Sequence, residues 1–152
     1  MNGRGWLALL LGVLVPLGFA VGGEEVRFRR HVINAASMFS ACAVMDVNRD
    51  GELDVVCGDS WYEATGDGEW KTHFIREVAM IRGRYDGYSH LPFDVDGDGW
   101  MDFINVNYRS SSMFWVRHPG ADLDQEWKKH TIALPGAMET GRLVDVDGDG
   151  KM

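Results

Sequence analysis

Short alternating patterns of apolar and polar residues run along most of this sequence. Segments rich in β-branched and aromatic residues show this pattern at 26–33, 52–58, 101–108, 112–118 and 127–134. Glycine, proline and aspartate are dense between them, for example at 63–69 and 118–122. Strands have a side-chain period of two, and turns favour those residue types. No segment after residue 21 sustains a helical period, so the pattern predicts an all-β protein made of short strands.

The first residues of the chain carry a different pattern. Arg4 is followed by an uncharged, mainly apolar run from Trp6 to Val21, and small residues come next. This order is typical of a secretory signal peptide, which we predict over residues 1–22. A retained membrane anchor is the alternative, but the run is 16 residues long and a spanning helix needs about 20. We therefore expect a secreted, periplasmic or cell-surface protein with no stable membrane span after cleavage.

An acidic loop occurs three times in the chain. It reads DVNRDGELD at 46–54, DVDGDGWMD at 94–102 and DVDGDGKM at 145–152, so its first aspartates lie 48 and 51 residues apart. A second motif, in the order aromatic, basic, any, His, any, Ile, recurs in phase at 28–33, 70–75 and 127–132. Periods of about 40–50 residues are typical of solenoids and propellers, and about four short strands make one propeller blade.

These repeats predict the architecture. We expect all-β blades of about four antiparallel strands, forming an incomplete β-propeller, an open arc of about two to three blades. The predicted partial propeller spans residues 23–152, with repeats near 26–75, 76–132 and 133–152, the last of them truncated.

The second motif places a histidine in the same slot of each repeat, at His31, His73 and His130. A residue required once per repeat is more often structural than catalytic, so we interpret these histidines as architectural. Large rings suit the space between sheets. We therefore expect inter-blade packing, rather than a sugar-stacking platform, from Trp61, Trp70, Trp115 and Trp127.

The net charge of the chain limits the classes of molecule that it can bind. The formal net charge is −8, with 23 acidic and 15 basic residues, and the sequence shows no basic patch. Binding to nucleic acid needs such a patch, so we exclude nucleic acid as a partner. The three loops hold three, four and three aspartates, so much of the acidity is local, as a cation site requires.

The loops carry oxygen-bearing side chains at positions 1, 3, 5 and 9, and glycine at position 6 permits a sharp turn. Several charged, hard oxygen ligands around one point suit Ca²⁺ better than Mg²⁺. The predicted side-chain ligands are Asp46, Asn48, Asp50 and Asp54 in the first loop, Asp94, Asp96, Asp98 and Asp102 in the second, and Asp145, Asp147 and Asp149 in the third, which ends before position 9.

Position 7 adds an expected ligand through its backbone carbonyl, from Glu52 or Trp100, as in other calcium loops. The EF-hand is excluded, because its position 12 must be a glutamate and is Cys57 or Asn105 here. A solvated acidic turn without metal is the alternative. Repulsion among the clustered carboxylates favours a bound cation instead.

The sequences DVNRDGELDVV and DVDGDGWMDFI resemble the calcium loops of FG-GAP/VCBS-type repeats, the blades of the integrin-α-like β-propeller family. The resemblance extends from about Val26 to the end of the chain. It implies that each loop joins two strands of a blade and that aspartate or asparagine at positions 1, 3, 5 and 9 binds calcium. Such repeats are common in exported bacterial proteins, which agrees with the predicted signal peptide.

Cys42 and Cys57 flank the first loop. If that loop joins two antiparallel strands, the cysteines lie nearly opposite each other, and a disulfide depends on the geometry there. Export would let such a disulfide persist. Two small buried thiols are the alternative, and the spacing fits no zinc or redox motif.

Three functions are compatible with these observations. The first is an exported, non-enzymatic calcium-binding propeller that binds an unknown protein or glycan ligand. The second is part of a propeller-based, lyase-like enzyme acting on polysaccharides. Its candidate residues are Tyr108, Arg109 and Arg117, or Arg82, Arg84 and Tyr85. The third is a truncated remnant without activity.

Because the chain stops at Met152 inside the third loop, we expect the N-terminal part of a longer protein or a truncated reading frame.

Overall fold

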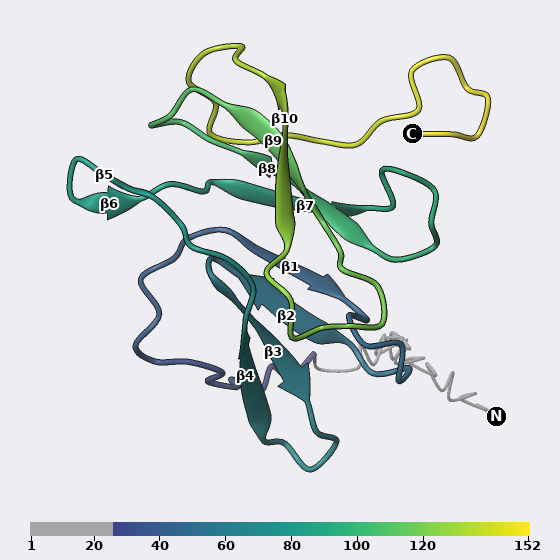
Figure 1. The fold of residues 1–152 in the computed structure, drawn as a ribbon. Helices are drawn as coiled ribbons and strands as arrows, with labels where there is room; N and C mark the ends of the chain where they lie inside the picture. Colours follow the sequence, from purple (N-terminus) through teal and green to yellow (C-terminus); the bar gives the residue numbers. More distant parts are fainter. Residues whose placement is uncertain (1–25) are drawn as a thin grey trace, which may run out of the picture. The chain divides into compact units, whose positions relative to one another are not determined.

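The computed structural model describes residues 26–152, so the signal peptide predicted at 1–22 lies outside the described residues. The chain divides into two compact units, residues 1–31 and residues 32–152. All of the described strands belong to the second unit (Figure 1). The described part of the chain contains no helix with the length and apolar character that a membrane crossing requires.

The described residues contain ten short strands. They are β1 (Cys42–Met45), β2 (Asp54–Cys57), β3 (Ser60–Ala64), β4 (Trp70–Phe74), β5 (Met80–Ile81), β6 (Arg84–Tyr85), β7 (Ser89–Phe93), β8 (Asp102–Val106), β9 (Met113–Arg117) and β10 (Lys128–Ala133).

The strands form two four-stranded antiparallel sheets and one small hairpin. The first sheet has the order β1-β2-β3-β4, and the second runs β7-β8-β9-β10, so each strand pairs with the next along the chain. β5 and β6 form the hairpin between the two sheets in sequence. The prediction of an all-β protein with incomplete, propeller-like blades of four antiparallel strands is confirmed.

The strand predicted at 26–33 is wrong, because these residues form no strand. The equivalent motifs at 70–75 and 127–132 supply β4 and β10, which are the last strands of their sheets and pair with β3 and β9. Within the described residues no strand precedes 26–33. A strand at 26–33 would need such a preceding neighbour for its backbone hydrogen bonds, and residues 1–25 lie outside the described part of the chain.

The apolar core lies between the two sheets of the second unit. β1 alternates exposed and buried residues, so that Ala43 and Met45 point into the core. One cluster contains buried side chains of both sheets, among them Val56, Trp61, Phe103, Val116 and Trp127. The prediction of inter-blade packing is therefore confirmed for Trp61 and Trp127. It is wrong for Trp70 and Trp115, which are partly exposed and lie outside this cluster.

The repeated histidines pack on tryptophans of the neighbouring strand. His73 is the register partner of Trp61, and their ring centroids are 4.2 Å apart in a stacked arrangement. His130 repeats this contact on Trp115 at 4.6 Å. His73 and His130 thus have a structural role in joining the last two strands of each sheet. His31 is exposed in the segment without a strand.

We expect Trp127→Ala to lower the free energy of unfolding by about 3–5 kcal/mol, because it removes a large side chain that is only 1% exposed. Leu134 is 75% exposed, so Leu134→Ala should change it by less than about 0.5 kcal/mol. Urea denaturation of both variants measures the difference. Equal effects of the two substitutions would contradict the described core.

Candidate functional site

Each complete acidic loop joins the first two strands of its sheet. The first loop connects β1 to β2, and the second connects β7 to β8. The third loop follows β10, and no strand comes after it in the described residues. The loops therefore lie between paired strands, which hold both ends of each complete loop at a fixed separation.

Hydrogen bonds inside each loop fold it around its own carboxylates. The carboxylate at position 1 accepts a bond from the N–H of the glycine at position 6, at 3.1, 2.9 and 2.7 Å in the three loops. The carboxylate at position 5 accepts a bond from the N–H of position 7, at 2.8, 2.9 and 2.8 Å. Short side chains that bond to nearby backbone N–H groups are typical of Asx turns. These bonds all join groups within the same loop.

The backbone of the loops is left-handed at two positions. Position 6 is the predicted glycine in all three loops, with φ between 86° and 92°. Position 4 is also left-handed, at Gly97, Gly148 and Arg49, with φ of 73°, 76° and 62°. This second requirement is not among the features predicted from the sequence, although glycine at position 4 of two loops is its signal. Arg49 adopts a conformation that glycine reaches at lower cost.

Position 9 holds a fully buried carboxylate in both complete loops. Asp54 accepts hydrogen bonds from the N–H groups of Val47 and Ala64, each at 2.9 Å. Asp102 accepts the equivalent bonds from Val95 at 3.0 Å and His118 at 2.7 Å. One donor comes from position 2 of the loop, and the other comes from the end of the third strand or the residue after it. The carboxylate therefore ties the loop to the third strand of the same sheet.

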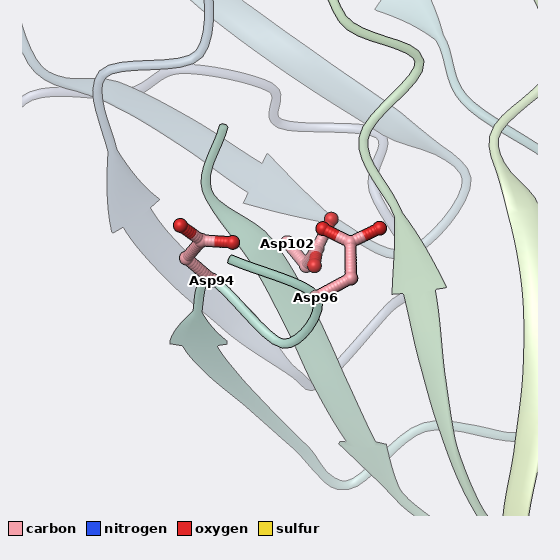
Figure 2. A group of neighbouring side chains, drawn as sticks. All are labelled: Asp94, Asp96 and Asp102. Carbon is pink, nitrogen blue, oxygen red and sulfur yellow. The ribbon is translucent and has the colours of Figure 1, made fainter. Parts of the chain in front are cut away.

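Three carboxylates converge in the second loop. One oxygen from each of Asp94, Asp96 and Asp102 lies within 4.8 Å of the other two, and Figure 2 shows these side chains gathered where β8 begins. The third loop has a similar group formed by Asp145, Asp147 and Asp149. Such acidic clusters could bind a metal ion.

The first loop differs from the other two. Within the described residues its carboxylates form no group as close as those of the second loop. Asn48 replaces the aspartate at position 3, and its amide donates to a carboxylate oxygen of Asp50 at 2.9 Å. The Asp98 carboxylate of the second loop is also outside the converging group. It stays a prediction that the backbone carbonyls of Glu52 and Trp100 act as ligands.

The loop positions have opposite electrostatic environments. Burial raises the pKa of Asp102, and hydrogen bonds from His118 and Val95 only partly oppose this effect. Burial also raises the pKa of Asp54. The N–H of Trp100 lowers the pKa of Asp98, and the N–H of Glu52 lowers that of Asp50. Each complete loop thus combines an exposed carboxylate that ionises readily with a buried one that is costly to ionise without a cation.

A side chain of the third strand reaches position 3 of each complete loop, but its charge differs. In the second blade, Nε of Arg117 lies 2.7 Å from Oδ2 of Asp96, and Nη2 lies 3.2 Å from Oδ2 of Asp98. In the first blade the equivalent residue is Glu63, which accepts a hydrogen bond from the Asn48 amide at 3.5 Å. The ion pairs of Arg117 show that carboxylates of the second loop hold a positively charged side chain.

The comparisons agree with this repeated geometry. A model of the FG-GAP-like repeat matches residues 46–105 and again residues 94–152, which together cover more than half of the chain. The chain belongs to the FG-GAP-like repeat family. Each match begins at the first aspartate of an acidic loop, so the family repeat contains the loop and the strands that follow it. Neither the curated proteins nor the solved structures gave a match.

A buried histidine links the two complete loops of this FG-GAP-like repeat protein. Nε2 of His118 lies 3.0 Å from the carbonyl oxygen of Val47, and Nδ1 accepts a hydrogen bond from the N–H of Gly120 at 3.0 Å. His118 is therefore neutral, with its proton on Nε2, and burial lowers its pKa. Its ring also stacks on Trp100 at 4.8 Å. The sequence gives no signal for His118, because this histidine lies outside the repeated histidine motif.

Arg49 of the first loop completes this connection. Its guanidinium lies 3.6 Å from the ring centroid of Trp100 and donates a hydrogen bond to the carbonyl of Gly99. Both contacts cross from the first loop to the second. No pattern in the sequence indicated this pair, because the two residues are about fifty positions apart.

The two alternative sets of candidate catalytic residues lie on different parts of the second unit. Arg117 is bound to the second loop, whereas Arg82, Arg84 and Tyr85 belong to the β5–β6 hairpin or its turn. A separate cleft is lined by Arg84 and Tyr85, together with Tyr88. Tyr108 lies beside Tyr88, with 5.8 Å between the ring centroids.

The raised pKa of Asp102 predicts a pH dependence for the calcium-free protein. Because its folded-state pKa is above its unfolded value, protonation favours the folded state. The stabilising contribution is complete below the unfolded pKa and is lost as the pH rises through the folded pKa. Asp102→Asn cannot titrate. We expect the melting temperature of the unmodified protein to fall relative to that of Asp102→Asn as the pH rises from about 4 in chelator.

Differential scanning fluorimetry across this range checks the pH dependence. Asp124→Asn, which replaces an exposed carboxylate outside the acidic loops, serves as the control for the loss of one charge. A difference between the protein and Asp102→Asn that stays constant or grows with pH would contradict the interpretation of the buried carboxylate.

Proposed function

We propose that this protein is an exported, non-enzymatic β-propeller repeat protein that binds Ca²⁺ in its acidic loops and presents its blades to a protein or glycan ligand. The observation that carries the proposal is the convergence of oxygens from Asp94, Asp96 and Asp102 within 4.8 Å. The donor set is entirely carboxylate and fits a hard cation. The guanidinium of Arg117 beside Asp96 supports the same fit, because it is a positive group held at this loop.

The role of the ion would be structural. Asp102 is bonded both to the start of the loop and to the residue after β9, so a cation bound there would join these two segments. It would also offset the cost of a buried carboxylate next to the charges of Asp96 and Asp98. An ion that binds only the folded state stabilises it by mass action.

The three loops should differ in affinity. The second loop offers four aspartates and is the strongest candidate, with Asp94, Asp96, Asp98 and Asp102 as side-chain ligands and the Trp100 carbonyl as a further one. The first loop replaces one aspartate by Asn48 and uses Asp46, Asp50, Asp54 and the Glu52 carbonyl, so we expect weaker binding. The third loop contributes Asp145, Asp147 and Asp149.

Membership of the FG-GAP-like repeat family supports two parts of the proposal, the non-enzymatic role and the export of the protein. Repeats of this family are generally non-enzymatic and often belong to extracellular or surface proteins. The cleft lined by Arg84, Tyr85 and Tyr88 offers an arginine and two aromatic rings, which suit a glycan or an acidic peptide. We propose this cleft as the first surface to examine for the partner. Activity on uronic-acid polymers would favour the lyase-like alternative instead.

Calcium should raise the melting temperature, and chelation should lower it. Asp96→Asn removes one charge from the converging group while keeping the size of the side chain. We expect it to weaken calcium binding at the second loop, as Asn48 does at the same position of the first loop, and to shrink the shift caused by calcium. Asp124→Asn removes the same charge from an exposed position and should leave both quantities unchanged. Isothermal titration calorimetry and thermal melts measure them; melts unaffected by calcium would refute the proposal.

The charge of the third-strand residue should tune each loop. Arg117→Gln removes a cation bonded to Asp96 and Asp98, so calcium should bind the second loop about fivefold more tightly. Lys128→Gln is the control. It removes the same charge from the residue on β10 that is the register partner of Arg117. Calorimetry at constant ionic strength measures both affinities. An unchanged or weaker affinity in Arg117→Gln would show that the arginine does not oppose the ion.

A further inference from the structure

Two cysteines face each other at the base of the first loop. Cys42 on β1 is the direct register partner of Cys57 on β2, and their sulfur atoms lie 2.9 Å apart. The Cα atoms of facing residues in an antiparallel pair are about 4.5–5.5 Å apart, which lies within the range that a disulfide spans. The strand register therefore places the two side chains where a bond can form without movement of the backbone.

The cysteine pair is peculiar to the first blade. The equivalent register pair in the second blade is His90 on β7 opposite Asn105 on β8. A pair required by the repeat architecture would recur in both sheets, as the stacked tryptophan and histidine do. Packing of the blade thus does not explain why both positions are cysteine here.

We propose that Cys42 and Cys57 are a site of reversible oxidation, forming a cross-strand disulfide by exchange with a small-molecule disulfide such as oxidised glutathione. Cys42 is the exposed member of the pair, so its sulfur meets the oxidant first. Cys57 is buried beside it and acts as the resolving sulfur. Both cysteines are free thiols in this structure.

The exchange has two steps. The Cys42 sulfur, after losing its proton, attacks one sulfur of oxidised glutathione; the glutathione disulfide breaks, and one glutathione leaves as a thiolate that takes up a proton. The Cys57 sulfur then attacks Sγ of Cys42 and releases the second glutathione, which takes up the proton from Cys57. Two protein thiols are oxidised and one glutathione disulfide is reduced to two thiols.

The surroundings support thiolate formation near neutral pH. The hydrogen bond from the Cys42 thiol lowers the pKa of Cys57 to about 7, and Ser37 contributes in the same direction from 3.9 Å. The same hydrogen bond raises the pKa of Cys42, so the attacking Cys42 thiolate forms when its proton passes to the ionised Cys57 sulfur 2.9 Å away. The bond would close the hairpin that carries the first acidic loop. It would therefore restrict the unfolded chain around residues 42–57 without changing the register of β1 and β2.

Peptide mapping of the folded, full chain tests the proposal directly. The protein is equilibrated with oxidised glutathione, in buffer with and without calcium, and free thiols are blocked with iodoacetamide. Trypsin cleaves after Arg30, Arg49 and Lys71, so the two cysteines fall in different peptides, 31–49 and 50–71. We expect these peptides to remain linked until a reductant is added. Cys42→Ser should yield no linked peptide.

Stability gives a second readout that does not depend on a variant. The oxidised protein should melt roughly 5–10 °C above the reduced protein. The same oxidant should leave the melting temperature of Cys42→Ser unchanged. Two alkylated cysteines after treatment with excess oxidised glutathione, or disulfides only between molecules, would overturn the proposal.

Discussion

A buried carboxylate at the end of each acidic loop is the constraint on which the blades depend. Asp54 and Asp102 are completely removed from solvent, and both oxygens of each accept backbone N–H bonds. A charge in such a place is costly unless hydrogen bonds or an opposite charge compensate for it. The bonds come from the loop and from the third strand, so the compensation also fixes the blade. The proposed cation would supply the charge that hydrogen bonds alone do not.

The two blades are joined by contacts that begin in these loops. The loop carbonyl of Val47 lies against the His118 ring, and Arg49 covers Trp100 of the second loop. Trp61 of the first sheet and Trp127, which directly precedes β10 of the second sheet, belong to the same apolar cluster. The proposed ion site of the second loop is thus next to the contacts that join the two repeats. Stability of the loops and stability of the inter-blade core are expected to depend on each other, as in other repeat proteins with neighbour contacts.

Equivalent positions in the two blades carry different chemistry on the same backbone. Arg117 and Glu63 occupy one slot with opposite charges, and the pair Cys42–Cys57 corresponds to His90–Asn105. The shared hydrogen bonds of position 9 preserve the blade in both cases. The repeat therefore fixes the geometry, while individual side chains adjust the charge around each loop and the chemistry at its base.

The sequence by itself determined the all-β class, the blade repeat and the conformation of the loops. These features follow from local interactions: strand periodicity, glycine at position 6, and carboxylates that bond to N–H groups two to five residues away. The sequence was a poorer guide to features that depend on contacts between residues far apart in the chain. Residues 26–33 have a strand pattern but form no strand in the structure. The donors to Asp102 include His118, sixteen residues away, and Arg49 contacts Gly99 across fifty. Only the tertiary structure decides such contacts, because they join segments that lie far apart in the sequence.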